Sequence, residues 1–158
     1  MRALLQRVSR ASVRVDSDAV GAIDLGWAIL LGVRKTDTEQ TARRLAGRVA
    51  HLRGFSDDQD RLNLSVLDVS GAALVVSQVT LYADTTRGRR PSFSEAAPLD
   101  LASHLVDAFA SSLSELGVTV ETGRFRAHMV VELANDGPVT FLLTEEEGGQ
   151  DVNPTTRG

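Results

Sequence analysis

One apolar run in the sequence is followed directly by polar residues. Residues 73–76 (Ala-Leu-Val-Val) are apolar without interruption, which is typical of a strand buried on both faces. The sequence then switches to the polar residues Ser77, Gln78 and Thr80, with Val79 and Leu81 between and after them, and we expect the strand to continue to Tyr82. Its two faces would hold Ser77, Val79 and Leu81 on one side and Gln78 and Thr80 on the other. Burying an unpaired hydroxyl or amide costs about 1–3 kcal/mol, so these polar groups either bond neighbouring backbone or line a ligand site.

Other segments of continuous or alternating apolar residues predict further strands. We expect them at residues 2–8, 11–16, 20–23, 27–33, 62–66, 118–121, 125–133 and 139–144. Between the last two lies Asn135-Asp136-Gly137-Pro138, whose residue types are those of a hairpin turn.

Two stretches have the period of an amphipathic helix. The first begins at the capping-box pair Thr36 and Glu39 and ends at Gly54. The second begins with Asp100 as its cap and ends at Leu116. The expected buried stripes are Ala42, Leu45, Val49 and Leu52, and Leu101, Leu105, Phe109, Leu113 and Leu116.

About eight strands and two helices that do not alternate argue against a doubly wound parallel sheet. We predict a mixed α/β fold (α+β-like): a largely antiparallel sheet or barrel packed by two amphipathic helices. The 158 residues suggest one domain over residues 1–144. Residues 145–158 hold four acids, one arginine and one larger apolar residue, Val152, and are predicted to be a disordered tail.

Net charge, hydrophobic pattern and cysteine count exclude several classes of protein. A net charge of −4 argues against broad non-specific nucleic-acid binding, although it does not exclude a local basic patch. No apolar run approaches the roughly 18 residues of a membrane span, and residues 1–7 lack the features of a signal peptide. With zero cysteines there is neither a disulfide nor a thiolate nucleophile. A cytoplasmic protein without membrane contact is the simplest prediction.

The sequence lacks most familiar catalytic patterns. Its three histidines, His51, His104 and His128, do not have metal-ligand spacing, and there is no nucleophile elbow or phosphate loop. We therefore expect no metal or cofactor, and a reactive group that comes from the substrate. The loop at residues 83–97 contains Arg87, Arg89 and Arg90, which either contact phosphate or are merely solvated.

Two motifs together resemble the D-aminoacyl-tRNA deacylase family. They are Ser77-Gln78-Val79-Thr80-Leu81 and Asn135-Asp136-Gly137-Pro138-Val139-Thr140. The similarity extends in order from Met1 to about Thr144, through segments such as Gln6-Arg7-Val8, Arg90-Pro91-Ser92-Phe93 and Thr122-Gly123-Arg124-Phe125. The chain departs from the family at Val79, where a phenylalanine is usual.

The resemblance implies a homodimer with a deacylase-like fold that acts on the acceptor end of D-aminoacyl-tRNA. It would hydrolyse the ester of a D-amino acid, or of glycine mischarged on tRNA, and release free D-amino acid and tRNA. A cis Gly137-Pro138 peptide would enter the partner subunit's site and reject L-aminoacyl-tRNA. The implied catalytic residues are Ser77, Gln78 and Thr80. The implied substrate-binding residues are Val79, Leu81, Asn135, Gly137, Pro138, Val139 and Thr140. No DNA partner is implied.

Several alternatives remain open at this stage. The nucleophile is water activated by the 2′-hydroxyl of the terminal adenosine, which we favour, or Thr80 itself. A non-catalytic RNA- or amino-acid-binding module, a structural dimer with a trans Gly137-Pro138 turn, and an editing enzyme for another ester are the rival functions.

Overall fold

The computed structural model describes residues 1–148, and in that part of the chain eight strands, two α-helices and one short 3-10 helix are present. The strands are β1 (Arg2–Val15), β2 (Asp18–Ile23), β3 (Gly26–Gly32), β4 (Phe55–Ser56), β5 (Leu62–Leu64), β6 (Ala72–Ser77), β7 (Thr119–Thr122) and β8 (Val130–Thr144). The helices are α1 (Glu39–His51), η1 (Val79–Tyr82) and α2 (Leu99–Glu115). The predicted mixed fold is confirmed.

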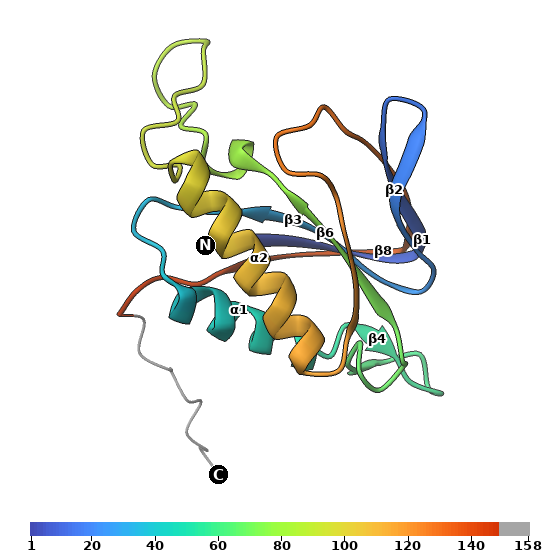
Figure 1. The fold of residues 1–158 in the computed structure, drawn as a ribbon. Helices are drawn as coiled ribbons and strands as arrows, with labels where there is room; N and C mark the ends of the chain where they lie inside the picture. Colours follow the sequence, from blue (N-terminus) through green and yellow to red (C-terminus); the bar gives the residue numbers. More distant parts are fainter. Residues whose placement is uncertain (149–158) are drawn as a thin grey trace.

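The main sheet is built around β1. Antiparallel to it, β3 pairs with its first half, β2 pairs with its second half, and β8 runs along its other edge. Beyond β3, the strands β6 and β7 continue the sheet in parallel. The sheet curls until β2 meets β7, where a Cβ on Gly21 would lie 2.8 Å from the Thr122 carbonyl oxygen. The result is a nearly closed barrel with both α-helices on one side (Figure 1).

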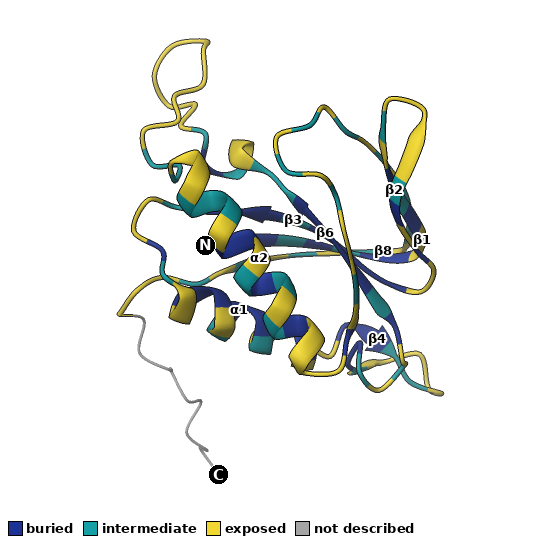
Figure 2. Ribbon diagram, in the orientation of Figure 1, coloured by how far each residue is buried: buried dark blue, intermediate teal, exposed yellow. Residues whose placement is uncertain are grey.

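Alternate residues of β3 and β6 point into two separate cores. Ile29, Leu31 and Val75 belong to the larger core between the sheet and the helices. Ala28 and Leu74 belong to the smaller core inside the barrel. The continuous apolar run in β6 is therefore buried on both faces, as predicted. Figure 2 shows the same pattern, with the inward sides of α1 and α2 buried and their outer sides exposed.

Both helices begin at a different residue from the one predicted. In α1 the cap is Thr38, whose hydroxyl accepts from the Thr41 amide while Thr41 Oγ1 accepts from the Thr38 amide. The capping box thus uses a second threonine rather than the Thr36 and Glu39 pair. The cap position of α2 is Pro98, and Asp100 lies inside the first turn. The predicted stripes are otherwise buried or half-buried, except that Leu116, at the end of α2, is exposed.

Two pairs of predicted strands are each a single long strand. Residues 2–15 form β1 and join the first two predicted strands, and residues 130–144 form β8. The segment Phe125–Met129 precedes β8 as a loop rather than beginning it. Asn135 to Pro138 is therefore not a hairpin turn, because β8 pairs with β1 on both sides of it.

The first residues of the predicted tail contact the body of the protein. The Met1 amino group lies 2.7 Å from Asp37 Oδ1 and donates to the Glu145 carbonyl at 2.6 Å. The Glu145 carboxylate pairs with Arg44 and Arg48, each at 3.0 Å. Residues 149–158 lie outside the described part of the chain. None of the helices among residues 1–148 has the length and apolar character of a membrane span.

Candidate active site

The strand β6 ends at Ser77, and the chain turns there into η1. The last ladder bond runs from the Gln78 amide to the Leu31 carbonyl at 2.8 Å. The Leu81 amide then bonds back to the Gln78 carbonyl at 3.3 Å, which closes the first turn of η1. The prediction of an extended strand to Tyr82, with its two alternating faces, is therefore wrong beyond Ser77. The turn instead brings Gln78 and Thr80 together, and Gln78 Nε2 donates to Thr80 Oγ1.

Arg2 holds η1 against the sheet. Its Nη1 donates to the Leu81 carbonyl at 2.8 Å, and its guanidinium lies 4.6 Å from the centre of the Tyr82 ring. Burial raises the pKa of Tyr82 to about 12, so its phenol stays neutral and does not act as a base at neutral pH. Gly32 permits the close approach, since a Cβ there would lie 2.9 Å from Leu81 Cβ.

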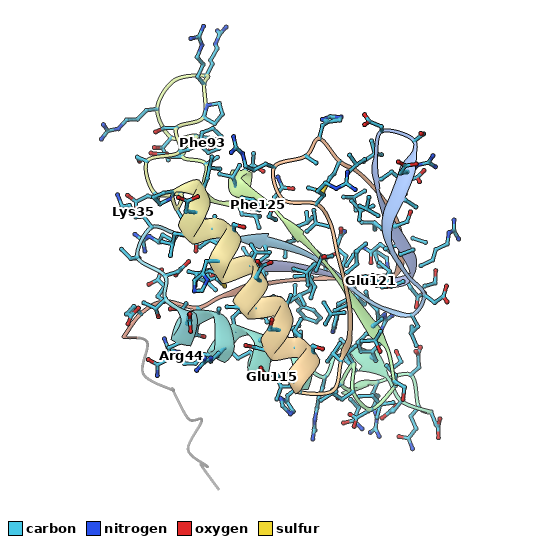
Figure 3. The ribbon with its side chains drawn as sticks, in the orientation of Figure 1. Lys35, Arg44, Phe93, Glu115, Glu121 and Phe125 are labelled. Atoms are coloured by element: carbon cyan, nitrogen blue, oxygen red, sulfur yellow. The ribbon has the colours of Figure 1, made fainter. Side chains whose placement is uncertain are left out.

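A cavity of about 320 Å³ opens beside this turn, at the ends of β3 and β6. Ser77, Gln78 and Val79 form one wall, and Leu99, Ala102 and Val106 at the beginning of α2 form another. The loop Phe125–Met129 closes a third side, and Figure 3 shows Phe125 beside the end of β6. The cavity lining is therefore mostly apolar, with polar side chains at the turn after β6 (Ser77, Gln78) and in the loop (Arg126, His128). Ligand sites commonly combine an apolar lining with a few polar groups.

Thr80 and Leu81, which the resemblance includes in the site, do not line this cavity. Thr80 is exposed and reaches the site only through its bond to Gln78. Val79 is 55% exposed at the mouth of the cavity, and Phe125 is the aromatic ring in the lining. The sequence does not reveal the loop Phe125–Met129, because its apolar residues also fit the beginning of a strand.

The second motif is a bulge in β8. Gln6 pairs with Thr140 and Val8 pairs with Asn135, so the four residues 136–139 lie opposite the single residue Arg7. Side chains hold the two ends of the bulge: Asn135 Nδ2 donates to Thr140 Oγ1 at 3.1 Å, and the Val139 amide donates to Asn135 Oδ1 at 3.2 Å. The Gly137–Pro138 peptide in the bulge is cis, and the trans turn of one rival function is not found.

Arg7 fills the space that the bulge leaves. Its Nε donates to the Asp136 carbonyl at 3.0 Å, and its Nη1 donates to the Gly54 carbonyl at 3.1 Å. Gly137 has a φ of +128°, and a Cβ there would lie 2.9 Å from Arg7 Nη2 and 2.8 Å from Val139 Cγ2. Only glycine fits both the conformation and the space. Sequence reasoning missed the role of Arg7, since a single arginine in a strand has no distinctive pattern.

The structure does not bring the two motifs together within one chain. Following the pairing across the sheet, Ser77 is level with Leu31, Ala3 and Leu143. From Ser77 to Gly137 the path crosses three strand spacings of about 4.8 Å each. Along β8 it also covers more than three residues, at about 3.3 Å per residue, because Gly137 lies beyond Thr140 as seen from Leu143. Gly137 and Pro138 line a different, open depression with Arg7, Phe55 and Ser56.

Comparison with known proteins identifies the family. The family model described as "D-Tyr-tRNA(Tyr) deacylase" matches residues 4–144, which is most of the chain. The chain belongs to this family. The expectation from the two motifs is confirmed, and the protein is an aminoacyl-tRNA ester hydrolase by family.

Individual relatives agree with the family model. The chain is 61% identical to the D-aminoacyl-tRNA deacylase of Roseiflexus sp. (strain RS-1) over 143 residues, which cover 90% of this chain and 92% of that protein. It is 59% identical to the D-aminoacyl-tRNA deacylase of Thermomicrobium roseum over 147 residues, which cover 93% of this chain and 96% of that one.

Two solved structures share the fold. One is titled c-Myc DNA Unwinding Element Binding Protein and aligns with a TM-score of 0.86 at 35% identity, covering 91% of this chain and 98% of the other. The other is titled as a probable eukaryotic D-amino acid tRNA deacylase, with a TM-score of 0.76 at 17% identity over 90% of this chain and 97% of the other. The second supports the fold only.

The bonds of Arg7 give a first prediction. Arg7→Lys keeps the charge but loses the planar fork that reaches two carbonyls at once. We expect hydrolysis of D-aminoacyl-tRNA to slow by about 10–100-fold, because the bulge is no longer held in place. The free energy of unfolding, measured with urea, should fall by only about 1–2 kcal/mol.

The control is Arg10→Lys, at an exposed position of the same strand, which should behave as the parent protein. If Arg7→Lys retains full activity, the bulge does not need this side chain.

Proposed function

We propose that this protein is a chiral proofreading hydrolase. It cleaves the ester between a D-amino acid, or glycine, and the terminal ribose of tRNA, releases free D-amino acid and tRNA, and leaves L-aminoacyl-tRNA intact. We place the reaction in the cytoplasm, where tRNA is charged. The observation that supports this most strongly is the arrangement of the two motifs. One is a polar turn beside a cavity, the other is a glycine-proline bulge, and the two lie far apart on one chain.

The separation of the motifs is accounted for if the active site is completed by a second copy of the chain. β8 pairs only with β1, and none of its residues is buried within the described chain. Its outer side, where Leu142 is 56% exposed, is available to a partner. A two-fold symmetric dimer would place each bulge against the cavity of the other subunit, giving two equivalent sites.

Selection by handedness would then come from main chain. In the proposed dimer, the carbonyls of Gly137 and Pro138 bind the amino group of the substrate and leave no room for an L side chain. A D side chain points away from them, and glycine has none, so both are accepted. Because the contacts are made by backbone, the discrimination is independent of which D-amino acid is attached.

The polar turn supplies binding and charge stabilisation rather than a strong base. Ser77 and Gln78 contact the ribose and the ester, and Thr80 orients the Gln78 amide through their mutual hydrogen bond. The amides of Val79 and Thr80 precede the first internal bond of η1, so they are free to stabilise the oxyanion. The 2′-hydroxyl of the terminal adenosine activates the attacking water.

His128 offers an alternative base that the mechanism must exclude. It lines the cavity, and with Arg126 it is one of two ionisable residues that do so. Histidine is the commonest general base in enzymes, and Thr80 is the alternative nucleophile. If the substrate assists its own cleavage, neither the His128 nor the Thr80 side chain is required for the reaction.

The central experiment compares matched D- and L-tyrosyl-tRNA. We expect rapid hydrolysis of the D ester only. Gly137→Ala should slow the D reaction by about 10–100-fold and reduce the ratio of the D rate to the L rate, because the added Cβ displaces the bulge. Gly47→Ala is the matched control, since nothing lies within 4 Å of a Cβ at that helical glycine. Equal rates on the two esters with the parent protein would refute the proposal.

Replacing the substrate's hydroxyl tests the chemistry. A tRNA ending in 2′-deoxyadenosine, charged on its 3′-hydroxyl, should not be turned over although it still binds. The double variant Thr80→Ala/His128→Gln should keep at least about one tenth of the parent rate on ordinary substrate. Loss of all activity in that variant, with turnover of the deoxy substrate by the parent, would assign the chemistry to a protein side chain.

A further inference from the structure

A basic hairpin projects from the body between η1 and α2. The amide and carbonyl of Asp84 bond the carbonyl and amide of Ser92 at 2.7 and 2.9 Å, which closes the base of the hairpin. All residues from Asp84 to Ser94 are exposed. Gly88, with a φ of +70°, lies at the tip, and three arginines surround it: Arg87, Arg89 and Arg90. Figure 1 shows this segment extending away from the sheet and helices.

The positive charge of the hairpin is not cancelled by nearby acids. Within residues 1–148, none of the ion pairs involves Arg87, Arg89 or Arg90. Glu95, just beyond the hairpin, pairs with Arg34 at 2.8 Å and with Lys35 at 3.0 Å. Those hydrogen bonds hold the pKa of the Glu95 carboxyl below its usual value.

Asp84 is the one acid within the hairpin, and its carboxylate accepts from the Thr86 amide and hydroxyl. A chain with a net charge of −4 thus presents three free guanidinium groups at one exposed tip. Such a concentration of one sign of charge attracts a polyanion.

The hairpin is connected directly to two walls of the cavity. The chain enters the hairpin from η1, whose first residue, Val79, lines the cavity next to Gln78. It leaves the hairpin toward Ala97 and Leu99 in the other wall. The tip lies four residues from the base and therefore reaches up to about 13 Å outward. A ligand that extends out of the cavity along the hairpin would therefore reach the tip.

An exposed aromatic ring accompanies the arginines. Phe93 is 41% exposed, and Figure 3 shows it near the base of the hairpin. Arginines for phosphate and an aromatic ring for base stacking are the usual combination in proteins that bind single-stranded nucleic acid. An acidic protein partner would not require the exposed ring.

We propose that the hairpin 84–93 binds the unpaired nucleotides that precede the terminal adenosine of tRNA. The three arginines contact backbone phosphates, and Phe93 stacks on a base. The inference rests on the proposed function, because the terminal adenosine must occupy the cavity for its neighbours to reach the hairpin. It assigns binding of the acceptor strand to this segment and leaves cleavage to the cavity and the bulge.

The test uses the full chain and two substrates: D-tyrosyl-tRNA and D-tyrosyl-adenosine, which has no phosphodiester. The variant R87Q/R89Q/R90Q should lower kcat/KM on the tRNA about tenfold near 0.15 M salt, mainly through KM. The slope of log(kcat/KM) against log[salt] should become shallower by about 2, since each lost phosphate contact removes about 0.7. Activity on D-tyrosyl-adenosine should be unchanged.

Two further variants test whether the position of the arginines matters and whether the Phe93 ring contributes. R43Q/R53Q/R61Q removes three exposed arginines elsewhere and should retain the parent rate and salt slope. Phe93→Leu should weaken tRNA binding while leaving the salt slope as it is.

The outcomes distinguish this inference from the proposed function. If the hairpin variant matches the parent on tRNA, or loses activity on D-tyrosyl-adenosine to the same extent, the hairpin has no role in binding tRNA. Binding of anionic lipid vesicles through the three arginines, with tRNA turnover unchanged, would also overturn the inference. If the parent protein itself hydrolyses neither substrate, the proposed function fails first.

Discussion

The mismatch between β1 and β8 is the constraint on which the rest of the site depends. The two strands pair over most of their length, yet four residues of β8 lie opposite Arg7 alone. The extra residues must leave the sheet, and the guanidinium of Arg7 occupies the space behind them and bonds the Asp136 carbonyl. A regular hairpin at this point would have kept Gly137 and Pro138 within an ordinary turn. In the bulge they instead lie beside Arg7, at the edge of an open depression.

The cavity arises from a second interruption of regular pairing. β6 is buried on both faces until Ser77, and the Gln78 amide makes its last bond to β3. The turn η1 then exposes polar groups next to apolar walls from α2 and the loop Phe125–Met129. Both candidate features are thus irregular backbone at the end or edge of regular strands. The basic hairpin that follows η1 extends the same surface outward.

The sequence was most informative where side-chain pattern alone decides structure. The apolar run at residues 73–76 predicted a strand buried on both faces, and the helical stripes predicted both helices, since burial depends on spacing along the chain. The beginning of α1 differs from the prediction because the Thr41 hydroxyl completes the capping box in place of the Glu39 carboxylate. Of the candidate site, only the two motifs could be predicted from the sequence. The bulge depends on the register between β1 and β8, and the role of Arg7 depends on that bulge, so neither appears in local sequence.

Whether one active site needs two chains can be measured directly with mixed dimers. One chain would carry Ala127→Trp, which fills the cavity, and the other Gly137→Ala, which displaces the bulge; each variant alone should show little D-selective hydrolysis. If the cavity of one chain works with the bulge of the other, the purified mixed dimer contains one intact site and should recover about half of the parent activity. No recovery above the separate variants, in a dimer shown to contain both chains, would contradict a site shared across the interface.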